Sequence, residues 1–359
     1  MLLVFALAAG LWLLGWVTGL PQRLRWAMIA ILYLAVLALH LTLPDAHPLR
    51  LATGQSPALW LLLGGAGLIA LVYGLGVRAL KRRAVAKPEA AAPQKPVQGS
   101  FSETELTRYA RHIVLRELGG PGQKRLKQAR VLVIGAGGLG SPALLYLAAA
   151  GVGTIGVIDD DTVDGSNLQR QVIHTDARIG MPKVFSAKAA IEALNPFVTV
   201  RPYQRRLEEE IAAQLFADYD LILDGTDNFD TRYLSNRTAV ALGKPLISGA
   251  LAQWEGQVSV FDPARGAPCY QCIFPEAPAP GLAPSCAEAG VIAPLPGVVG
   301  AMMAVEAVKV IADAGAPLRG AMLIYDALYA ETRRIGLKPR PDCPVCGAVQ
   351  RDRQSASRS

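Results

Sequence analysis

Long apolar runs and short apolar segments divide this chain into two parts. Three apolar runs cover residues 1–20, 26–43 and 57–75, and each is close to the ~20 residues that cross a bilayer as a helix. From residue 130 onward, short apolar segments alternate instead with helical stretches, which is typical of a mostly parallel sheet with helices on both faces. Nearly all Asp and Glu residues follow residue 88. The pattern predicts a three-helix membrane anchor followed by an α/β domain.

Basic residues near the ends of the runs predict the orientation of the anchor, because Lys and Arg are retained on the cytoplasmic side. Arg23 and Arg25 follow the first run, whereas the second loop has only Arg50, beside Asp45. Five basic residues come after the third run: Arg78, Lys81, Arg82, Arg83 and Lys87. We expect a multi-pass protein of the cell inner membrane, with its N-terminus outside and the residues after 80 in the cytoplasm. No basic residue precedes Arg23 and no charge lies within a run, so neither a cleaved leader nor a transport path is expected.

A linker of low apolar content separates the two parts. Residues 84–100 are rich in Ala, Pro and Gln and lack an apolar period, which is typical of a flexible tether. Ser102 followed by Glu105 fits a capping box, so a helix is expected at the start of the domain. The expected divisions are an anchor at 1–80, a linker at 81–100, a domain at 101–349 and a disordered tail at 350–359.

The domain is expected to be α/β, with a Rossmann-like doubly wound sheet and an added antiparallel portion. Residues 302–315 read as a helix ended by Gly315. Residues 275–297 contain six prolines and are predicted to form a long loop, and a loop of that length is usually functional. Five apolar segments are the expected strands: 131–134, 155–158, 221–224, 245–251 and 257–261.

A glycine-rich turn directly follows the first of these strands and opens a helix. The turn, Gly135-Ala-Gly137-Gly138-Leu-Gly140, lets the backbone approach phosphate oxygens at a helix N-terminus. Asp159 ends the next strand, where a carboxylate would accept a hydrogen bond from a ribose hydroxyl. The turn therefore predicts a nucleotide site, and by itself it suggests a dinucleotide oxidoreductase.

The segment after the second strand favours phosphoryl chemistry over hydride transfer. It sets Asp161, Asn167, Arg170 and Gln171 within a dozen residues, and Lys183 follows. A redox domain needs few cations near its pyrophosphate, because no phosphoryl bond breaks there. In nucleotidyl transfer, charge builds on the α-phosphate and on the departing pyrophosphate, and Arg, Lys and Mg²⁺ stabilise that charge.

Asp227 and Asn228 come just after the strand at 221–224, at the carboxyl edge where an open α/β sheet places its ligand. A carboxylate at this edge can hold Mg²⁺ that bridges phosphate oxygens. Asp224 and Asp227 could instead only cap the following turn and helix, as Asp often does. The residues alone leave both interpretations open.

Four cysteines form two CxxC pairs, Cys269 with Cys272 and Cys343 with Cys346, which is typical of a structural Zn²⁺ site with four sulfur ligands. Disulfides are not expected in a reducing cytosol. Zinc would tie the C-terminal segment back to the domain. The fifth cysteine, Cys286, lies in the predicted loop; a loop thiol can act as a nucleophile if its pKa falls, but no His or Lys stands beside it.

Residues 101–349 resemble, throughout their length, the molybdopterin-synthase and thiamine sulfur-carrier adenylyltransferases (the HesA/MoeB/ThiF family), relatives of the ubiquitin-activating enzymes. The resemblance implies that the terminal glycine carboxylate of a small ubiquitin-like carrier protein, ending in Gly-Gly, attacks the α-phosphate of ATP and gives an acyl-adenylate and pyrophosphate. It rests on RYARHI (108–113), GAGGLGS (135–141), DDDTVDGSNLQRQ (159–171), GMPKV (180–184), DGTDN (224–228), EGQVSVF (255–261), CAEAGV (286–291) and the two CxxC pairs.

The same resemblance implies roles for individual residues. Asp159 would hold the ribose, and Gly137 would approach the phosphates. Arg170 and Lys183 would bind the triphosphate, and Asp227 would coordinate Mg²⁺. The other positions of the expected ATP site are Gly135, Gly138, Gly140, Asp161, Asn167, Gln171 and Asn228.

Partners are implied as well. Arg111 matches a residue that, in the family, reaches into the active site of the other subunit, which implies a homodimer. Cys286 matches a cysteine with which some members form a thioester or acyl-disulfide with the carrier. Some members also have a C-terminal rhodanese domain that supplies sulfur; this sequence shows no such segment, so a separate sulfur donor is expected.

Three other functions fit part of the pattern. An NAD-dependent oxidoreductase would share the glycine turn but gives no reason for Arg111, Asp227 and four cysteines together. A relative that activates a tRNA carboxylate for dehydration is disfavoured, because no basic run interleaved with aromatic residues follows the membrane-proximal cluster. The net charge of +7 comes partly from that cluster. Nucleic acid is therefore not an expected partner. A membrane scaffold that does not catalyse the reaction would have been free to lose some of the polar residues that match the family. The sequence does not decide between molybdopterin and thiamine carriers.

Overall fold

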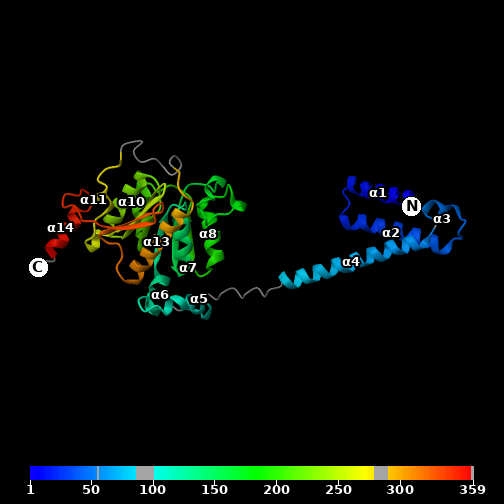
Figure 1. The fold of residues 1–359 in the computed structure, drawn as a ribbon, viewed down its shortest axis with the longest axis horizontal. Coiled ribbons are helices and arrows are strands. Elements are labelled where there is room, and N and C mark those ends of the chain that lie inside the picture. Colours follow the sequence, from blue (N-terminus) through cyan, green and yellow to red (C-terminus); the bar gives the residue numbers. More distant parts are fainter. Residues whose placement is uncertain (55, 86–100, 279–289, 357–359) are drawn as a thin grey trace. The chain divides into compact units, whose positions relative to one another are not determined.

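The computed structural model describes residues 1–54, 56–85, 101–278 and 290–356. The chain divides into two compact units, Met1–Lys95 and Pro96–Ser359. Figure 1 shows a small helical unit at the N-terminal end of the chain and a larger unit of sheet and helices. The boundary between the units falls within residues 81–100, where the sequence suggests a linker.

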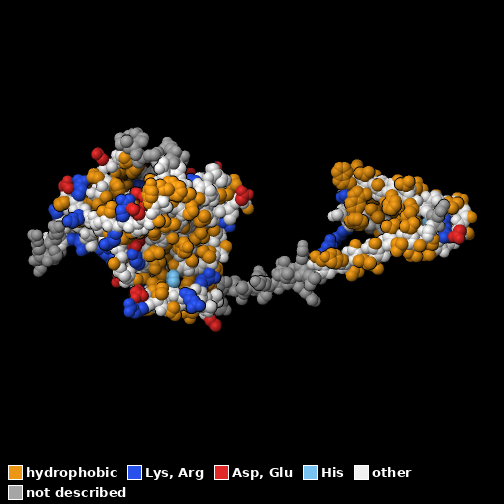
Figure 2. Space-filling view, in the orientation of Figure 1, with side chains coloured by type: hydrophobic (Ala, Val, Ile, Leu, Met, Phe, Trp, Pro, Cys, Tyr) orange, Lys and Arg blue, Asp and Glu red, His pale blue; other side chains and the backbone are white. Residues whose placement is uncertain are grey.

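The first unit is helical and exposes most of its apolar side chains. Buried Val4, Val36 and Trp60 pack together, and the Tyr33 hydroxyl donates to the Trp60 carbonyl at 2.7 Å. Figure 2 shows hydrophobic side chains over most of the visible surface of this unit. Its helices are α1 (Leu2–Val17), α2 (Gln22–Thr42), α3 (Pro48–Thr53) and α4 (Pro57–Val85).

Among the described residues, three helices are long and apolar enough to cross a membrane, judged by length and composition only. They are α2, Pro57–Arg78 within α4, and Pro294–Ala312 in the second unit. α1 is shorter than the run that predicted it: its 16 residues span about 24 Å, because the chain turns at Gly19, where φ is +71°. The two longer helices of the first unit match the predicted runs, whereas α1 is short for a hydrocarbon core of about 30 Å.

The second unit is built on one mixed sheet, as the sequence predicts. In the described part of the chain its strands follow the order β3-β2-β1-β4-β5-β6-β7-β8. The pairings among the first five are parallel, and those from β5 through β8 are antiparallel. The strands are β1 (Arg130–Ile134), β2 (Thr154–Ile158), β3 (Thr199–Tyr203), β4 (Leu221–Asp224), β5 (Leu246–Ala252), β6 (Glu255–Phe261), β7 (Ala321–Asp326) and β8 (Glu331–Gly336).

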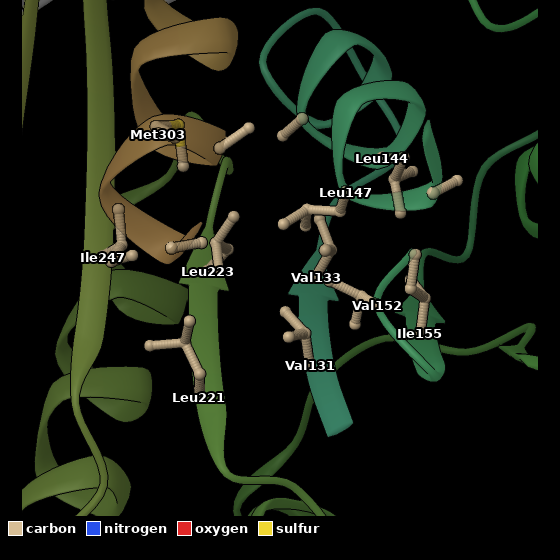
Figure 3. Close-up of a cluster of buried hydrophobic side chains, with 14 of the residues drawn as sticks. Val131, Val133, Leu144, Leu147, Val152, Ile155, Leu221, Leu223, Ile247 and Met303 are labelled. Atoms are coloured by element: carbon tan, nitrogen blue, oxygen red, sulfur yellow. The ribbon is translucent and has the colours of Figure 1, made fainter. Parts of the chain in front are cut away.

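Helices cover both faces of this sheet because its strands are apolar on both sides. On one face, α7 (Gly140–Ala150), α8 (Lys183–Leu194) and α13 (Pro294–Ala312) pack over β1, β2 and β4. Figure 3 shows Leu144 and Leu147 of α7 and Met303 of α13 directed at the strand residues beneath them. On the other face, α9 (Glu209–Ala217) and α10 (Phe229–Ala241) enclose a second core. α13 is mostly apolar, and part of it lies in the first core.

The domain begins with the predicted helix. α5 (Glu103–Ile113) opens with a complete capping box: the Ser102 hydroxyl accepts from the Glu105 N–H at 3.2 Å, and the Glu105 carboxylate accepts from the Ser102 N–H at 2.9 Å. Such a cap satisfies two backbone donors that no helical carbonyl reaches. α6 (Gly119–Gln128) follows and leads into β1.

Two expectations about the C-terminal half are wrong in part. The predicted loop 275–297 is shorter, because α13 already begins at Pro294, and proline at the first helical position costs no hydrogen bond. The predicted disordered tail is helical through Ala356, in α14 (Gly347–Ala356). Gln350 of this helix donates to the Ala267 carbonyl at 2.9 Å, a distant contact that local composition does not reveal.

Candidate functional site

A cavity of about 910 Å³ opens at the carboxyl ends of the parallel strands. It lies beside the point where the strand order reverses, between β1 and β4, which is where open α/β sheets bind ligands. The predicted site residues that line it are Gly135, Gly137, Gly138, Asp159, Asp161, Arg170, Gln171, Lys183, Asp227 and Asn228. The fold therefore brings five separate sequence segments to one place.

The glycine turn is packed too tightly for side chains at most of its positions. Gly135 has φ +90°, and a Cβ on Gly140 would lie 1.9 Å from the Gly135 carbonyl oxygen. A Cβ on Gly137 would meet only the Gln171 amide nitrogen, at 3.6 Å, so Gly137 is the open position of the turn. Gly140 is needed for the fold of the turn, whereas Gly137 leaves room for a ligand against the backbone.

Asp159 holds the glycine turn to the end of β2. Its carboxylate accepts from the Ala136 N–H at 2.7 Å and from the Asp161 N–H at 2.9 Å. Burial raises the pKa of Asp159 above its usual value, and the positive charge of Lys183 opposes that rise. The carboxylate lines the cavity and is oriented before any ligand arrives.

Lys183 lies at the first position of α8 and is almost fully buried, with 4% of its surface exposed. Its amine contacts the Asp161 carboxylate at 2.7 Å, and its backbone N–H donates to the Asp161 carbonyl at 2.9 Å. A buried ammonium needs such a partner. The pair fixes one cation and one exposed carboxylate at the cavity wall.

Arg170 and Gln171 form the neighbouring wall. The Arg170 guanidinium donates to the Asn167 side-chain oxygen at 2.8 Å, so Asn167 orients the arginine and is not itself among the described residues that line the cavity. Gln171 is buried, and its side-chain oxygen has no hydrogen-bond partner within the described part of the chain. That buried acceptor is available to a donor on a ligand.

The two interpretations of the aspartates after β4 are separated by the structure. Asn228 is the N-cap of α10, because its side chain accepts from the Thr231 N–H at 2.9 Å. Asp224 is buried and accepts from the Thr226 backbone N–H at 3.0 Å and hydroxyl at 2.6 Å. Capping is thus done by Asn228 and Asp224, which leaves the exposed Asp227 carboxylate at the cavity.

His174 was not singled out by its sequence context, yet it braces the glycine turn. Its Nε2 lies 2.9 Å from the Ala136 carbonyl oxygen and its Nδ1 lies 2.9 Å from the Ser186 hydroxyl. A carbonyl oxygen only accepts, so Nε2 carries the proton and Nδ1 accepts from Ser186. Burial lowers the pKa of His174, which favours this neutral form. A single histidine forms no periodic pattern or motif spacing, so the sequence could not identify His174 as part of the site.

Three arginines at the cavity were also missed. Arg205 and Arg206 follow β3, a strand that the apolar pattern did not predict. Arg232 of α10 is buried and donates to the Ser248 hydroxyl at 2.9 Å, to the Gly249 carbonyl at 2.7 Å and to the Thr226 carbonyl. It therefore ties the loop after β4 to β5.

Positive and negative charges balance in the cavity. A bound triphosphate would gain from the basic side chains and would be repelled by the acidic ones unless a cation were present. The oxygens of Asp159, Asp160 and Asp161 lie within 4.8 Å of one another, and such hard oxygen donors suit Mg²⁺. The lining has five basic residues (Arg170, Lys183, Arg205, Arg206, Arg232) and five acidic ones (Asp159, Asp160, Asp161, Asp227, Glu276).

The four paired cysteines come together as predicted and are all buried. Sγ–Sγ distances are 3.9 Å for Cys269 to Cys272, 3.6 Å for Cys269 to Cys343 and 3.3 Å for Cys272 to Cys346. Four sulfurs at about 2.3 Å from a tetrahedral zinc are separated by roughly 3.8 Å. The cluster therefore fits a zinc ion.

Four residues of the predicted catalytic and ATP site are not among the described residues that line the cavity: Gly140 and Asn167, which support the residues that do, and Arg111 and Cys286. Arg111 is exposed on α5 and is not among the described residues that line the cavity. In Figure 1, α5 lies at the bottom of this unit and α10 lies near its top. Cys286 falls at 279–289, outside the described residues.

The fold and the cavity define a nucleotide-binding α/β enzyme that also has a four-cysteine site. The ThiF family model matches residues 109–345, and the chain belongs to that family. "Sulfur carrier protein adenylyltransferase" of Thermus thermophilus is 51% identical over 69% of this chain and 93% of its own length. "SAMP-activating enzyme E1" of Haloferax volcanii is 48% identical over 69% of this chain and 91% of its own length. The chain is an adenylyltransferase of the MoeB/ThiF type.

A solved structure gives the same fold. A crystal structure of E. coli MccB with AMPCPP and selenomethionine MccA has a TM-score of 0.59, with 21% identity, and the match covers 69% of this chain and 75% of that one. At this identity the likeness concerns the arrangement of helices and strands alone. It agrees with the mixed α/β sheet described above.

Proposed function

We propose that this enzyme adenylylates the C-terminal glycine carboxylate of a small ubiquitin-like sulfur-carrier protein and releases pyrophosphate. The observation that carries the proposal is the meeting of the open Gly137, the cations Arg170 and Lys183 and the carboxylate of Asp227 in one cavity. Relatives named as sulfur-carrier adenylyltransferases support the same class of substrate. A carrier ending in Gly-Gly fits because a glycine tail has no side chains to hinder its approach to the bound nucleotide.

The reaction requires positioning and charge stabilisation more than proton transfer. A carboxylate oxygen of the carrier attacks the α-phosphorus, and the bond to the oxygen that bridges the α- and β-phosphates breaks. Pyrophosphate leaves with that electron pair, so no proton is exchanged in the step. Arg170 and Lys183 are placed to stabilise the charge that develops on the phosphoryl oxygens. ATP would lie against Gly137, with its ribose at Asp159.

Magnesium would enter with ATP. Asp227 is the exposed carboxylate after β4, and the group of Asp159, Asp160 and Asp161 faces it from the end of β2 across the same cavity. A divalent cation held by such oxygens would offset the acidic half of the lining and neutralise phosphate charge. Zinc at the four cysteines is the other metal of the proposal.

The test is ATP–pyrophosphate exchange by the full chain in mild detergent, with Mg²⁺ and with molybdopterin-type and thiamine-type carriers in separate reactions. Exchange that depends on one carrier is expected, together with a loss of about 100-fold or more in Asp227→Ala, because several kcal/mol of phosphate stabilisation disappear. Cys286→Ser should leave exchange intact, since adenylation needs no thiol. A folded wild type that binds ATP but exchanges with neither carrier would contradict the proposal and favour another carboxylate, as in a tRNA dehydratase, or a non-catalytic scaffold.

We also propose a homodimer in which Arg111 acts on the partner's site. Arg111 is exposed, and exposed apolar side chains lie on two adjacent helices of the same unit: Tyr146 of α7 is 59% exposed and Val305 of α13 is 56% exposed. An apolar face of this kind is suited to a second copy of the chain. A separate sulfur donor, acting after the adenylate has formed, stays a prediction.

The first unit is proposed to be a multi-pass anchor of the inner membrane, with residue 1 outside and the catalytic unit in the cytoplasm. The apolar surface of α2 and α4 and the five basic residues after the third run support this arrangement. Because α1 is short, the experiment tests whether α1 spans the membrane. A reporter that is active only outside the inner membrane is fused before residue 1, and it should be active. An inactive reporter in a protein that remains membrane-bound would mean that α1 does not cross.

A further inference from the structure

The four-cysteine cluster is built into a wall of the cavity. α11 (Tyr270–Ile273) is a single turn whose N-cap is Cys269 and which contains Cys272. Tyr270, which is buried, and Ile273 in this turn line the cavity, as does Phe274 after it. One short segment therefore supplies two sulfur ligands and three residues of the cavity wall.

Helix α10 joins the cluster to this wall. Asn236 is 1% exposed; its amide nitrogen donates to the Cys269 sulfur at 3.7 Å, and its side-chain oxygen accepts from the Tyr270 N–H at 2.8 Å. On the same helix, the Tyr233 hydroxyl donates to the Phe274 carbonyl at 3.0 Å. These contacts fix the backbone at both ends of α11 relative to α10.

Aromatic packing fixes the wall's side chains as well. The centroid of the Tyr270 ring lies 5.5 Å from that of Tyr233, with 79° between the ring planes, and 5.6 Å from that of Phe261, with 84° between the planes. The centroid of the Phe274 ring lies 4.8 Å from that of Tyr270. Edge-to-face pairs of this kind prefer a narrow range of geometries. A shift of α11 would therefore move the whole aromatic group.

α10 also begins at the part of the cavity that contains Asp227, here called the Asp227 end. It begins at the Asn228 cap, directly after Asp227, and its Arg232 holds the carbonyls of Thr226 and Gly249. Asn236 lies eight positions after the cap, or about 12 Å along the helix. The cysteine cluster and the Asp227 end of the cavity thus both contact the same helix, α10.

The chemistry of the wall indicates its occupant. The glycine turn, Lys183 and Arg170 form a polar end that suits phosphates, whereas Tyr270, Ile273 and Phe274 carry no charge and are followed in the lining by a single acidic residue, Glu276. An uncharged, extended peptide fits such a surface better than a triphosphate does. The inference rests on the proposed function, in which that peptide is the carrier's C-terminal tail.

We propose that the cysteine cluster, acting through Asn236 and Tyr233, holds the aromatic wall in the position that binds the carrier's tail. Asn236 and Tyr233 are then positioning residues for the second substrate. Loss of their contacts should weaken productive binding of the carrier and leave ATP binding unchanged.

The experiment compares full-length variants in detergent by three readouts: zinc per chain, the Kd for ATP, and the KM for the carrier in pyrophosphate exchange, with the molybdopterin-type and thiamine-type carriers as probes. Asn236→Ala should keep its zinc and its Kd for ATP while its KM for the carrier rises about tenfold, because buried hydrogen-bond partners are left unpaired. Tyr233→Phe removes only a hydroxyl and should shift the same KM by a smaller factor.

Matched controls remove the same groups elsewhere. Asn195→Ala deletes a buried amide that donates to the Tyr109 hydroxyl and the Ala148 carbonyl, away from the cavity. Tyr219→Phe deletes a buried hydroxyl that pairs with Tyr203. Both controls should keep the KM for the carrier even where thermal stability falls.

Each outcome decides something. If Asn236→Ala behaves like Asn195→Ala while the wild type shows carrier-dependent exchange, the inference is wrong and the proposed function stands. If its Kd for ATP weakens as much as its KM for the carrier, the wall serves the nucleotide and the inference is also overturned. If the wild type shows no carrier-dependent exchange, the proposed function fails first, and the inference fails with it.

Discussion

Individual side chains at the cavity are oriented by contacts within the protein. Asp159 is held by two backbone N–H groups, and Lys183 is paired with Asp161. Preorganised groups of this kind stabilise developing charge without having to move during the reaction. Neutral His174 adds a brace behind the glycine turn that the sequence pattern could not reveal, because only burial distinguishes it from an ordinary surface histidine.

The histidine makes stability depend on pH. Burial lowers the pKa of His174, so below the unfolded value of about 6.5 the unfolded chain binds a proton that the folded chain does not. Its contribution to stability is therefore present above that pH and is lost as the pH falls. Between about pH 7.5 and about pH 5.5, the Tm of the wild type should fall further than that of His174→Gln, in which an amide can still donate to the Ala136 carbonyl. Equal falls in the two proteins would mean that His174 does not titrate as inferred.

Secondary-structure elements divide the work of the second unit. The parallel strands bring the glycine turn, Asp159 and Asp227 to one edge, while α10 and α11 connect that edge to the cysteine cluster. Five strands with apolar runs were predicted from sequence. β3, which contains Pro202, and β8, whose residues are all exposed, were missed, because neither has the apolar content of a buried strand. β7 was also missed, although residues 321–325 form an apolar run.

Loss of one ligand should release the metal and loosen the elements that it joins. Cys343→Ser is expected to lose zinc and to lower the Tm by roughly 10 °C, since each kcal/mol shifts the Tm of a domain of this size by about 2–4 °C. Cys286→Ser is the matched control and should retain one zinc per chain. Elemental analysis and thermal unfolding monitored by circular dichroism check both statements. Full zinc occupancy in Cys343→Ser would contradict the assignment of the cluster.

At the scale of the assembled protein, the proposed homodimer gives Arg111 its role. Arg111 is not among the described residues that line the cavity, and α7 and α13 expose apolar side chains on the same unit. If the proposed dimer forms, each active site contains residues from two chains.

Mixed dimers test this arrangement directly. Arg111→Ala and Asp227→Ala chains, each inactive alone, should recover about a quarter of wild-type exchange when co-expressed at equal levels, because random pairing makes half of the dimers mixed and one site in each of these is complete. No recovery, despite mixed dimers isolated with two different tags, would place Arg111 in the site of its own chain. An Arg111→Ala chain that is active alone would place Arg111 outside catalysis.

The sequence by itself determined the two-part organisation, the α/β class, the glycine turn and the cysteine pairs, because apolar period, turn chemistry and ligand spacing are local properties of the chain. Only the tertiary structure decided that Asn228 caps α10 so that Asp227 stays at the cavity, that Arg232 and His174 brace it, and that the cysteine cluster shares a wall with it. These features depend on contacts between residues far apart in sequence, which burial and packing create and no local pattern encodes.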